Sequence, residues 1–236
     1  MERRIKGDVK PTRSNSSNRW MHEHVTDPFV QQAKKLGYRS RASFKIIDLD
    51  EKYKLFRRGM TVVDLGAAPG GWSQIAAPRV GVVTAKAATG KTGRVIALDL
   101  LDMPGLPGVE FLKGDFTSDE GLAAVVQSLS GADGKPGKVD LVMSDMSPNI
   151  SGIVISDQAK SMYLCEIALE FAANFLKPDG AFVVKSFQGA GFTEFLAAMR
   201  ATFREVKSLK PKASRGRSAE MYLVGRGLRE AGAGGS

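Results

Sequence analysis

Short apolar runs alternate with amphipathic stretches along most of the chain, beginning at about residue 60. Runs with the length of a strand are Thr61–Leu65, Arg94–Leu98, Val109–Leu112, Val139–Met143 and Ala181–Lys185. Helical periodicity is present at residues 71–78, 118–129, 157–176 and 191–203. Because strands that alternate with helices are joined by crossover connections, the pattern predicts an α/β fold with a parallel sheet covered on both faces. Two later runs, Glu205–Leu209 and Glu220–Val224, are expected to close the sheet as a hairpin.

The first quarter of the chain follows a different pattern. Helices are expected at Asp27–Leu36 and Ser40–Tyr53, separated by Gly37, with Ser40 as the N-cap of the second. Residues 1–19 are polar and basic and are predicted to form a disordered arm. Residues 227–236 are predicted to be a disordered tail, which leaves residues 20–226 as one domain, as the length of 236 residues favours. Residues 79–93 are expected to form a loop or to extend the first crossover.

The net charge of +9 is unevenly distributed. Residues 1–58 hold 15 Lys and Arg against 7 Asp and Glu, residues 59–199 hold 10 against 15, and residues 200–236 hold 9 against 3. Two interpretations stay open, namely basic ends that only aid solubility and a polyanion-binding surface built from both ends. The candidate phosphate contacts are Lys34, Lys35, Arg39, Arg41, Arg57, Arg58, Lys210, Lys212, Arg215 and Arg217. Trp20 and Tyr38 are either stacking platforms for bases or residues packed into the domain.

Composition excludes several classes of protein. A single cysteine, Cys165, cannot form an internal disulfide framework, and with only two histidines no metal site is expected. No apolar run approaches the roughly 18 residues that span a bilayer, and the N-terminal residues lack the apolar stretch of a secretory signal. We therefore expect a cytoplasmic protein with no membrane partner.

The most informative stretch is a strand that ends in an acid, followed by a glycine-rich turn and a helix: Thr61-Val-Val-Asp64-Leu-Gly66-Ala-Ala-Pro69-Gly70-Gly71-Trp72. Glycines let the backbone approach a ligand closely, and ligands of such sheets bind beyond the carboxyl ends of the strands. Neither the dinucleotide pattern G-x-G-x-x-G nor the phosphate loop G-x-x-x-x-G-K-[ST] is present. An acid at this position suits a ligand with hydroxyl or amino groups better than a pyrophosphate. A tight turn with no ligand is the alternative.

The next predicted strands also end in acids, namely Asp99, Asp115 and Asp145. Asp99 is placed to accept hydrogen bonds from both hydroxyls of a ribose, and Asp115 to accept one from an adenine amino group. A single aspartate at a strand end is commonly a helix cap or a turn former. Four of them along one edge of a sheet, with Asp64 included, favour a polar ligand instead.

Five stretches together resemble the FtsJ/RlmE family of S-adenosylmethionine-dependent RNA ribose 2'-O-methyltransferases. They are Ser40-Arg-Ala-Ser-Phe-Lys45, Val63-Asp-Leu-Gly-Ala-Ala-Pro-Gly-Gly-Trp-Ser-Gln74, Ser144-Asp-Met-Ser-Pro-Asn149, Val184-Lys-Ser-Phe-Gln-Gly189 and Ser214-Arg-Gly-Arg-Ser-Ala-Glu-Met-Tyr222. They occur in the family's order and span roughly residues 19–225. The resemblance implies a Rossmann-like methyltransferase sheet of seven strands, mostly parallel with one antiparallel strand.

The resemblance also implies a site. The family's cofactor contacts fall on Gly70, Trp72, Asp99, Asp115 and Asp145, and its catalytic set of two lysines and two acids on Lys45, Asp145, Lys185 and Glu220. The implied substrate is a uridine of 23S ribosomal RNA, on the 50S subunit, and we expect a monomeric enzyme. Alternatives are a transfer RNA or messenger RNA cap substrate, or a non-catalytic RNA-binding factor for ribosome assembly that retains the fold.

A ribose hydroxyl is a weak nucleophile at neutral pH, whereas the cofactor's sulfonium is a strong methyl donor. Aligning the two lowers barriers by roughly 7–11 kcal/mol, and a positioned base adds about 10²–10⁴-fold. Lys185, at the end of an apolar strand, is the candidate base. An ordinary lysine is protonated at neutral pH, so two roles stay open: a neutral amine that accepts the proton, or an ammonium that stabilises the developing alkoxide.

Overall fold

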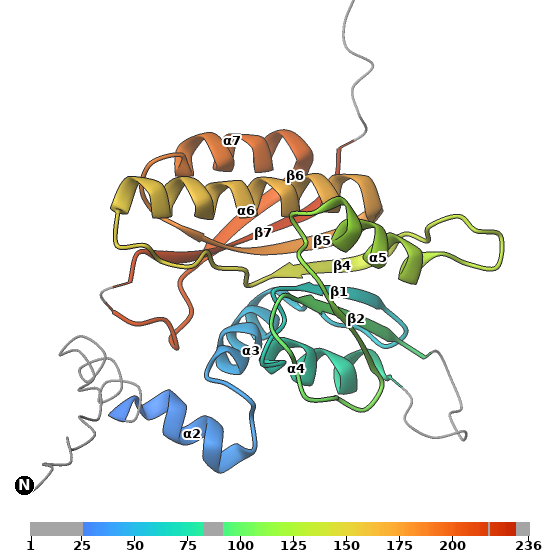
Figure 1. Ribbon diagram of the computed structural model, residues 1–236, viewed down its shortest axis with the longest axis horizontal. Helices are drawn as coiled ribbons and strands as arrows, with labels where there is room; N and C mark the ends of the chain where they lie inside the picture. The colour runs from blue at the N-terminus through green and yellow to red at the C-terminus, as the bar shows by residue number, and fades with distance from the viewer. Residues whose placement is uncertain (1–25, 83–91, 217, 230–236) are drawn as a thin grey trace, which may run out of the picture.

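The computed structural model describes residues 26–82, 92–216 and 218–229, which form one sheet with helices on both faces (Figure 1). The strands are β1 (Thr61–Leu65), β2 (Arg94–Asp99), β3 (Val109–Lys113), β4 (Val139–Ser144), β5 (Leu176–Phe187), β6 (Phe203–Leu209) and β7 (Glu220–Leu228). Their order across the sheet is β3-β2-β1-β4-β5-β7-β6. Strand β7 is antiparallel to both of its neighbours, and the other pairs are parallel. The prediction of a mostly parallel α/β sheet is confirmed.

Helices cover the sheet in two layers (Figure 1). They are α3 (Ala42–Tyr53), α4 (Gly71–Val80), α5 (Asp119–Leu129), α6 (Val154–Phe175) and α7 (Phe192–Thr202), whereas α2 (Pro28–Leu36) lies to the side of the sheet (Figure 1). Val62 of β1 packs into the core under α3 and α4, whereas the next residue, Val63, packs into the core under α5, α6 and α7. Both faces of β1 are therefore buried, which explains why its sequence is mostly apolar, with Asp64 as a buried exception. Within the described residues, no helix is both long enough and apolar enough to cross a bilayer.

Several element boundaries differ from the predicted ones. Helix α3 begins at Ala42, and its N-cap is Arg41 rather than the predicted Ser40. The Ser40 hydroxyl instead accepts a hydrogen bond from the Ala42 amide at 3.2 Å, just before the helix. Strand β7 continues to Leu228, where the disordered tail was expected from residue 227, because Leu228 pairs with Phe203 of β6. The predicted N-terminal arm, the remainder of the tail and most of the predicted loop at 79–93 lie outside the described residues.

The antiparallel strand β7 decides where the site forms. The carboxyl ends of β1, β2, β4 and β5 meet at one edge of the sheet because these strands run in the same direction. Strand β7 runs in the opposite direction, so its first residues arrive at that same edge, and Tyr222 pairs with Lys185 of β5. Chemistry from both ends of the chain is thus gathered at one edge.

Candidate active site

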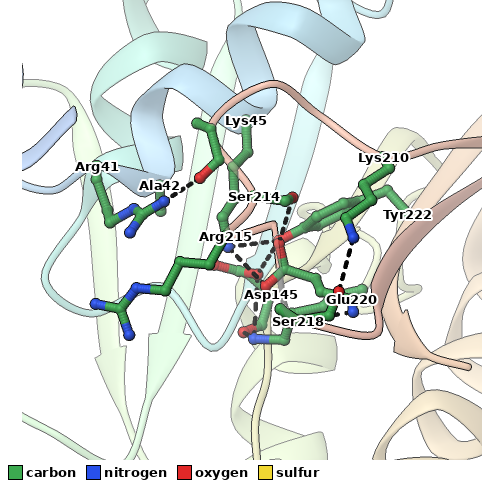
Figure 2. A network of polar contacts seen from close by, with 12 residues as sticks. Arg41, Ala42, Lys45, Asp145, Lys210, Ser214, Arg215, Ser218, Glu220 and Tyr222 are labelled. Carbon is green, nitrogen blue, oxygen red and sulfur yellow. Dashed lines mark hydrogen bonds and ion pairs between the residues drawn. The ribbon is translucent and has the colours of Figure 1, made fainter. Parts of the chain in front are cut away.

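The four residues of the predicted catalytic set lie in one network of polar contacts (Figure 2 shows most of it). The Lys45 amine, on α3, is 2.9 Å from a carboxylate oxygen of Glu220. The Lys185 amine, on β5, donates to the backbone carbonyl of Asp145 at 2.6 Å and is 3.2 Å from its carboxylate. The ion pairs Lys45–Glu220 and Lys185–Asp145 therefore lie next to each other, with residues from α3, β5, β7 and the loop after β4.

Tyr222 joins the two ion pairs, and sequence reasoning did not assign it a role. Its hydroxyl accepts a hydrogen bond from Lys45 at 3.1 Å and donates one to the Asp145 carboxylate at 2.8 Å. The side chain is completely buried, with its ring centroid 5.7 Å from that of Trp72. Burial, followed by the nearby charges of Asp145 and Glu220, raises the pKa of Tyr222 well above its ordinary value. The hydroxyl therefore stays protonated and remains a donor toward Asp145.

Asp145 is held in the ionised form. Burial alone raises the pKa of this carboxyl, but the ammonium groups of Lys185 and Lys45 and the hydrogen bond from Tyr222 outweigh it and hold the pKa below its ordinary value. A carboxylate surrounded by two ammonium groups and a hydroxyl has a fixed orientation. Asp145 is therefore the point where the catalytic network is anchored.

Glu220 is fixed by the loop that precedes it. Its second carboxylate oxygen accepts a hydrogen bond from the Ser214 hydroxyl at 2.7 Å, and its backbone amide donates to the Ser218 hydroxyl at 3.2 Å. Figure 2 shows both serines beside Glu220. In the sequence, Ser214 is marked only by its place in the motif stretch that ends at Tyr222. Nothing in that basic loop indicates that its hydroxyl donates to Glu220.

A cavity of about 640 Å³ opens beside this network, at the carboxyl ends of β1, β2 and β4. Asp99, Asp115 and Asp145 line it together with Gly66, Ala68 and Tyr163. This volume lies in the range of small-molecule sites. Three of the four strand-end acids thus surround one space, as the sequence predicts, and Asp145 belongs to both the cavity and the network.

Asp99 and Asp115 are oriented by backbone contacts that leave oxygen lone pairs free for a ligand. The two oxygens of Asp99 accept hydrogen bonds from the amides of Ala68 and Leu101, both at 2.8 Å. One oxygen of Asp115 accepts from the amide and the hydroxyl of Thr117, at 2.8 and 2.7 Å. Each carboxylate oxygen has further acceptor capacity. These carboxylate acceptors suit a ligand that donates from hydroxyl and amino groups, such as an adenosine.

Gly66 lets the glycine-rich turn lie close to the segment that follows Asp145. Its φ angle is +75°, and a Cβ atom there would lie 2.7 Å from the Met146 side chain and 2.9 Å from the Met146 backbone nitrogen. Only glycine combines the positive φ with this close approach to Met146 without displacing the segment after Asp145. The cavity, its acids and this glycine together fit a nucleoside-type cofactor.

Gly70 and Trp72 do not line this cavity. Gly70 has a φ of +101°, and a Cβ there would lie 2.8 Å from the Met103 sulfur, so the glycine shapes the turn. The Trp72 indole donates to the Ala42 carbonyl at 2.9 Å, and the side chain is only 2% exposed. Trp72 borders a much smaller hollow together with Asp145. This hollow shares Gly66, Ala68 and Asp145 with the main cavity, so Trp72 lies next to the predicted cofactor site.

Asp64 lies beneath the glycine-rich turn and does not reach the cavity. It is completely buried, and one carboxylate oxygen accepts a hydrogen bond from the Ser73 hydroxyl at 2.6 Å. Burial, with further contributions from the charges of Asp145 and Asp99, raises the pKa of Asp64 to about 7. This acid is a structural group of the fold, in contrast to the three acids that line the cavity.

The pKa of Asp64 predicts a pH dependence of stability. The folded protein keeps a proton on Asp64 from the unfolded pKa near 4 up to about 7, so the stability contributed by this proton is lost as the pH rises through that range. The free energy of unfolding is measured in urea at pH 5 and at pH 8 for the unchanged protein and for Asp64→Asn. From pH 5 to pH 8, the stability of the variant relative to the unchanged protein should rise by about 2 kcal/mol. A difference between the two proteins that is the same at both pH values would contradict the assignment.

Several of the basic residues expected to contact phosphates are used within the protein. The Arg39 side chain donates to three backbone carbonyls, and Arg41 contacts the Asp27 carboxylate and the Ala213 carbonyl. Lys210 donates to the carbonyls of Gly216 and Ser218. Exposed candidates are Lys34, Lys35, Arg57, Arg58 and Lys212, whereas Trp20 and Arg217 lie outside the described residues. The ring of Tyr38 packs edge-on against Phe44, with 5.4 Å between centroids.

Comparison with known proteins points in the same direction as this geometry. A model of the FtsJ-like methyltransferase family matches residues 38–228. A protein of Thiobacillus denitrificans named ribosomal RNA large subunit methyltransferase E is 52% identical over 217 residues, which cover 92% of each chain. A protein of the same name from Azoarcus sp. is 53% identical over 217 residues, which cover 92% of this chain and 99% of the relative.

A solved structure has the same arrangement of elements. The crystal structure of a Plasmodium falciparum protein, assigned as a ribosomal RNA methyltransferase, superposes with a TM-score of 0.68 at 25% identity. The match covers 81% of this chain and 98% of that protein.

Proposed function

The chain belongs to the FtsJ-like methyltransferase family, and on that premise we propose that it methylates the ribose 2'-hydroxyl of a uridine in 23S ribosomal RNA, with S-adenosylmethionine as the methyl donor. The observation that carries the reaction is the joining of Lys45, Asp145, Lys185 and Glu220 in one network beside the cavity. The ribosomal substrate is supported by the two relatives that are 52% and 53% identical and are named for the large subunit.

The acids that line the cavity would each hold a different part of the cofactor. S-adenosylmethionine, when bound, supplies an activated methyl group on a sulfonium. Asp99 would accept hydrogen bonds from the ribose hydroxyls of the cofactor, and Asp115 would accept one from its adenine amino group, since both keep free lone pairs on the cavity wall. Asp145 lies at the junction of the cavity and the network, and the target hydroxyl would be placed at that junction.

Lys185 acts on the oxygen of the target hydroxyl, whose proton passes to water as the bond between oxygen and the methyl group forms. Its side chain is 8% exposed, and two contacts with Asp145 fix the amine nitrogen. At this position the amine can orient the hydroxyl and hold negative charge as it develops on oxygen, with little competition from water. Lys45 and Glu220 neutralise each other and fix Tyr222, which in turn orients Asp145.

The substrate implies where and how the protein works. An enzyme that modifies the 50S subunit acts where ribosomes are assembled, so we place it in the cytoplasm. We also propose that it acts as a monomer, because an extended contact with RNA leaves little surface for a second copy.

The proposed reaction is tested by transfer of label from tritium-labelled S-adenosylmethionine. We expect label to enter 50S subunits that lack the modification and to be recovered as 2'-O-methyluridine after digestion to nucleosides. Naked 23S RNA, transfer RNA and capped messenger RNA serve as competing substrates in parallel reactions. If label enters only transfer RNA or only the messenger RNA cap, that RNA is the substrate and the ribosomal assignment is wrong. Cofactor binding without transfer to any RNA would support the non-catalytic alternative.

A further inference from the structure

Arg39 connects two loops that are distant in the sequence. It lies between α2 and α3, and its guanidinium donates to the Pro69 carbonyl at 3.2 Å and to the Gly105 carbonyl at 2.6 Å. A third hydrogen bond goes to the Pro104 carbonyl. We refer to residues 66–70 as the glycine-rich loop and to residues 100–108 as the β2 loop. One side chain from the N-terminal part of the chain thus holds both loops.

The base of this side chain is itself fixed. The Arg39 amide donates to the Gln74 side chain on α4 at 2.9 Å, and the Gln74 amide group donates in return to the Gly37 carbonyl at 2.9 Å. The segment that carries Arg39 is therefore tied to the helix that follows the glycine-rich loop. The guanidinium cannot move without disturbing these contacts.

Asp99 joins the same two loops from the opposite side. Its carboxylate accepts from Ala68 in the glycine-rich loop and from Leu101 in the β2 loop. Ala68, Asp99 and Leu101 all line the cavity, whereas Arg39 does not. Between the two connections the loops are in close contact, because a Cβ at Gly70 would meet the Met103 sulfur at 2.8 Å and an Arg39 nitrogen at 3.0 Å.

We propose that Arg39 is a positioning residue for the cofactor and that its guanidinium sets the separation of the two loops that form the wall around Asp99. The proposal rests on the proposed function, since it takes the ligand of this cavity to be S-adenosylmethionine. A guanidinium is a planar fork of donors, which can bridge carbonyls of two loops, whereas an ammonium is a compact charge that cannot span them in the same way. Without the fork, the polar connection between the loops rests on Asp99, beside the apolar cluster that includes Ala67 and Met103.

The test is the affinity of S-adenosylmethionine, measured by calorimetry in the absence of RNA. Arg39→Gln and Arg39→Lys should each bind the cofactor about tenfold or more weakly, whereas kcat at saturating cofactor stays close to that of the unchanged protein. Arg200→Gln is the matched control, because Arg200 is an exposed arginine on α7, far from the cavity. Its cofactor affinity should not change.

The lysine variant separates geometry from charge. The cofactor carries a net positive charge, so loss of a positive charge at position 39 does not by itself weaken binding. Arg39→Lys keeps the charge and loses the fork, and it also serves if the glutamine variant fails to fold. Cofactor affinity within twofold of the unchanged protein in a folded Arg39→Lys would overturn the proposal. If the unchanged protein itself does not bind the cofactor, the proposed function fails instead.

Discussion

Replacement of Lys185 by methionine should abolish methyl transfer and leave cofactor affinity within about threefold of the unchanged protein. The methionine side chain keeps the apolar volume of the lysine but removes the amine that is fixed against Asp145. Loss of a group that stabilises negative charge developing on the reacting oxygen costs about 10²–10³-fold in rate. Lys185 does not line the main cavity, so the affinity for S-adenosylmethionine should change little. Label transfer to 50S subunits measures the first quantity, and calorimetry measures the second.

Lys177 provides a control on the same strand. It lies at the opposite end of β5, where its amine is 2.8 Å from the Asp140 carboxylate. Lys177→Met removes a partly buried ion pair of the same type and should keep normal turnover. If a folded Lys185→Met protein turns over at the normal rate, Lys185 has no role in methyl transfer.

Replacement of Gly66 by alanine should lower the affinity for S-adenosylmethionine by about a hundredfold. The new methyl group combines a strained positive φ with a collision against the Met146 backbone. Since Met146 directly follows Asp145, the collision can be relieved only by a shift of the glycine-rich loop or of the segment that carries Asp145. Both segments line the cavity, so calorimetric titration with the cofactor reads out either shift.

Gly134 separates the two causes. It has a φ of +71°, and a Cβ there would have no neighbour within 4 Å. Gly134→Ala therefore carries the backbone strain of about 1–2 kcal/mol without any collision, and its cofactor affinity should be unchanged. If both variants bind S-adenosylmethionine normally, the close approach at Gly66 is unimportant for the cofactor.

The parallel part of the sheet follows from the sequence because its strands are buried on both faces and appear as continuous apolar runs. Strand β5 shows where this signal fails. The strand begins at Leu176, but Lys177-Pro-Asp-Gly180 is polar and has the composition of a turn, so the apolar pattern predicts a start at Ala181. The pairing with β4 is irregular between Val139 and Leu141, at this same end. Backbone pairing there does not depend on apolar side chains.

The residues proposed for catalysis follow from the sequence through the family motifs, whereas their partners do not. Tyr222 is an ordinary aromatic residue of a strand by its pattern, and only the pairing of β7 with β5 places its hydroxyl between Lys45 and Asp145. Arg39 shows the opposite error. Its charge favours a phosphate contact, but the acceptors that it meets belong to loops about 30 and 66 positions away, which no local pattern reveals.

The position of β7 also determines when the proposed site can be completed as the chain folds. This strand is the last one made among those described, yet it inserts between β5 and β6 and carries both Glu220 and Tyr222. A nascent chain that has already folded β1 to β5 has its aspartates and Lys185 in place but no partner for Lys45. Under the proposed function, methyl transfer therefore requires β7 to be paired with β5, and a product that ends before β7 should be inactive and leave β5 with an unpaired edge.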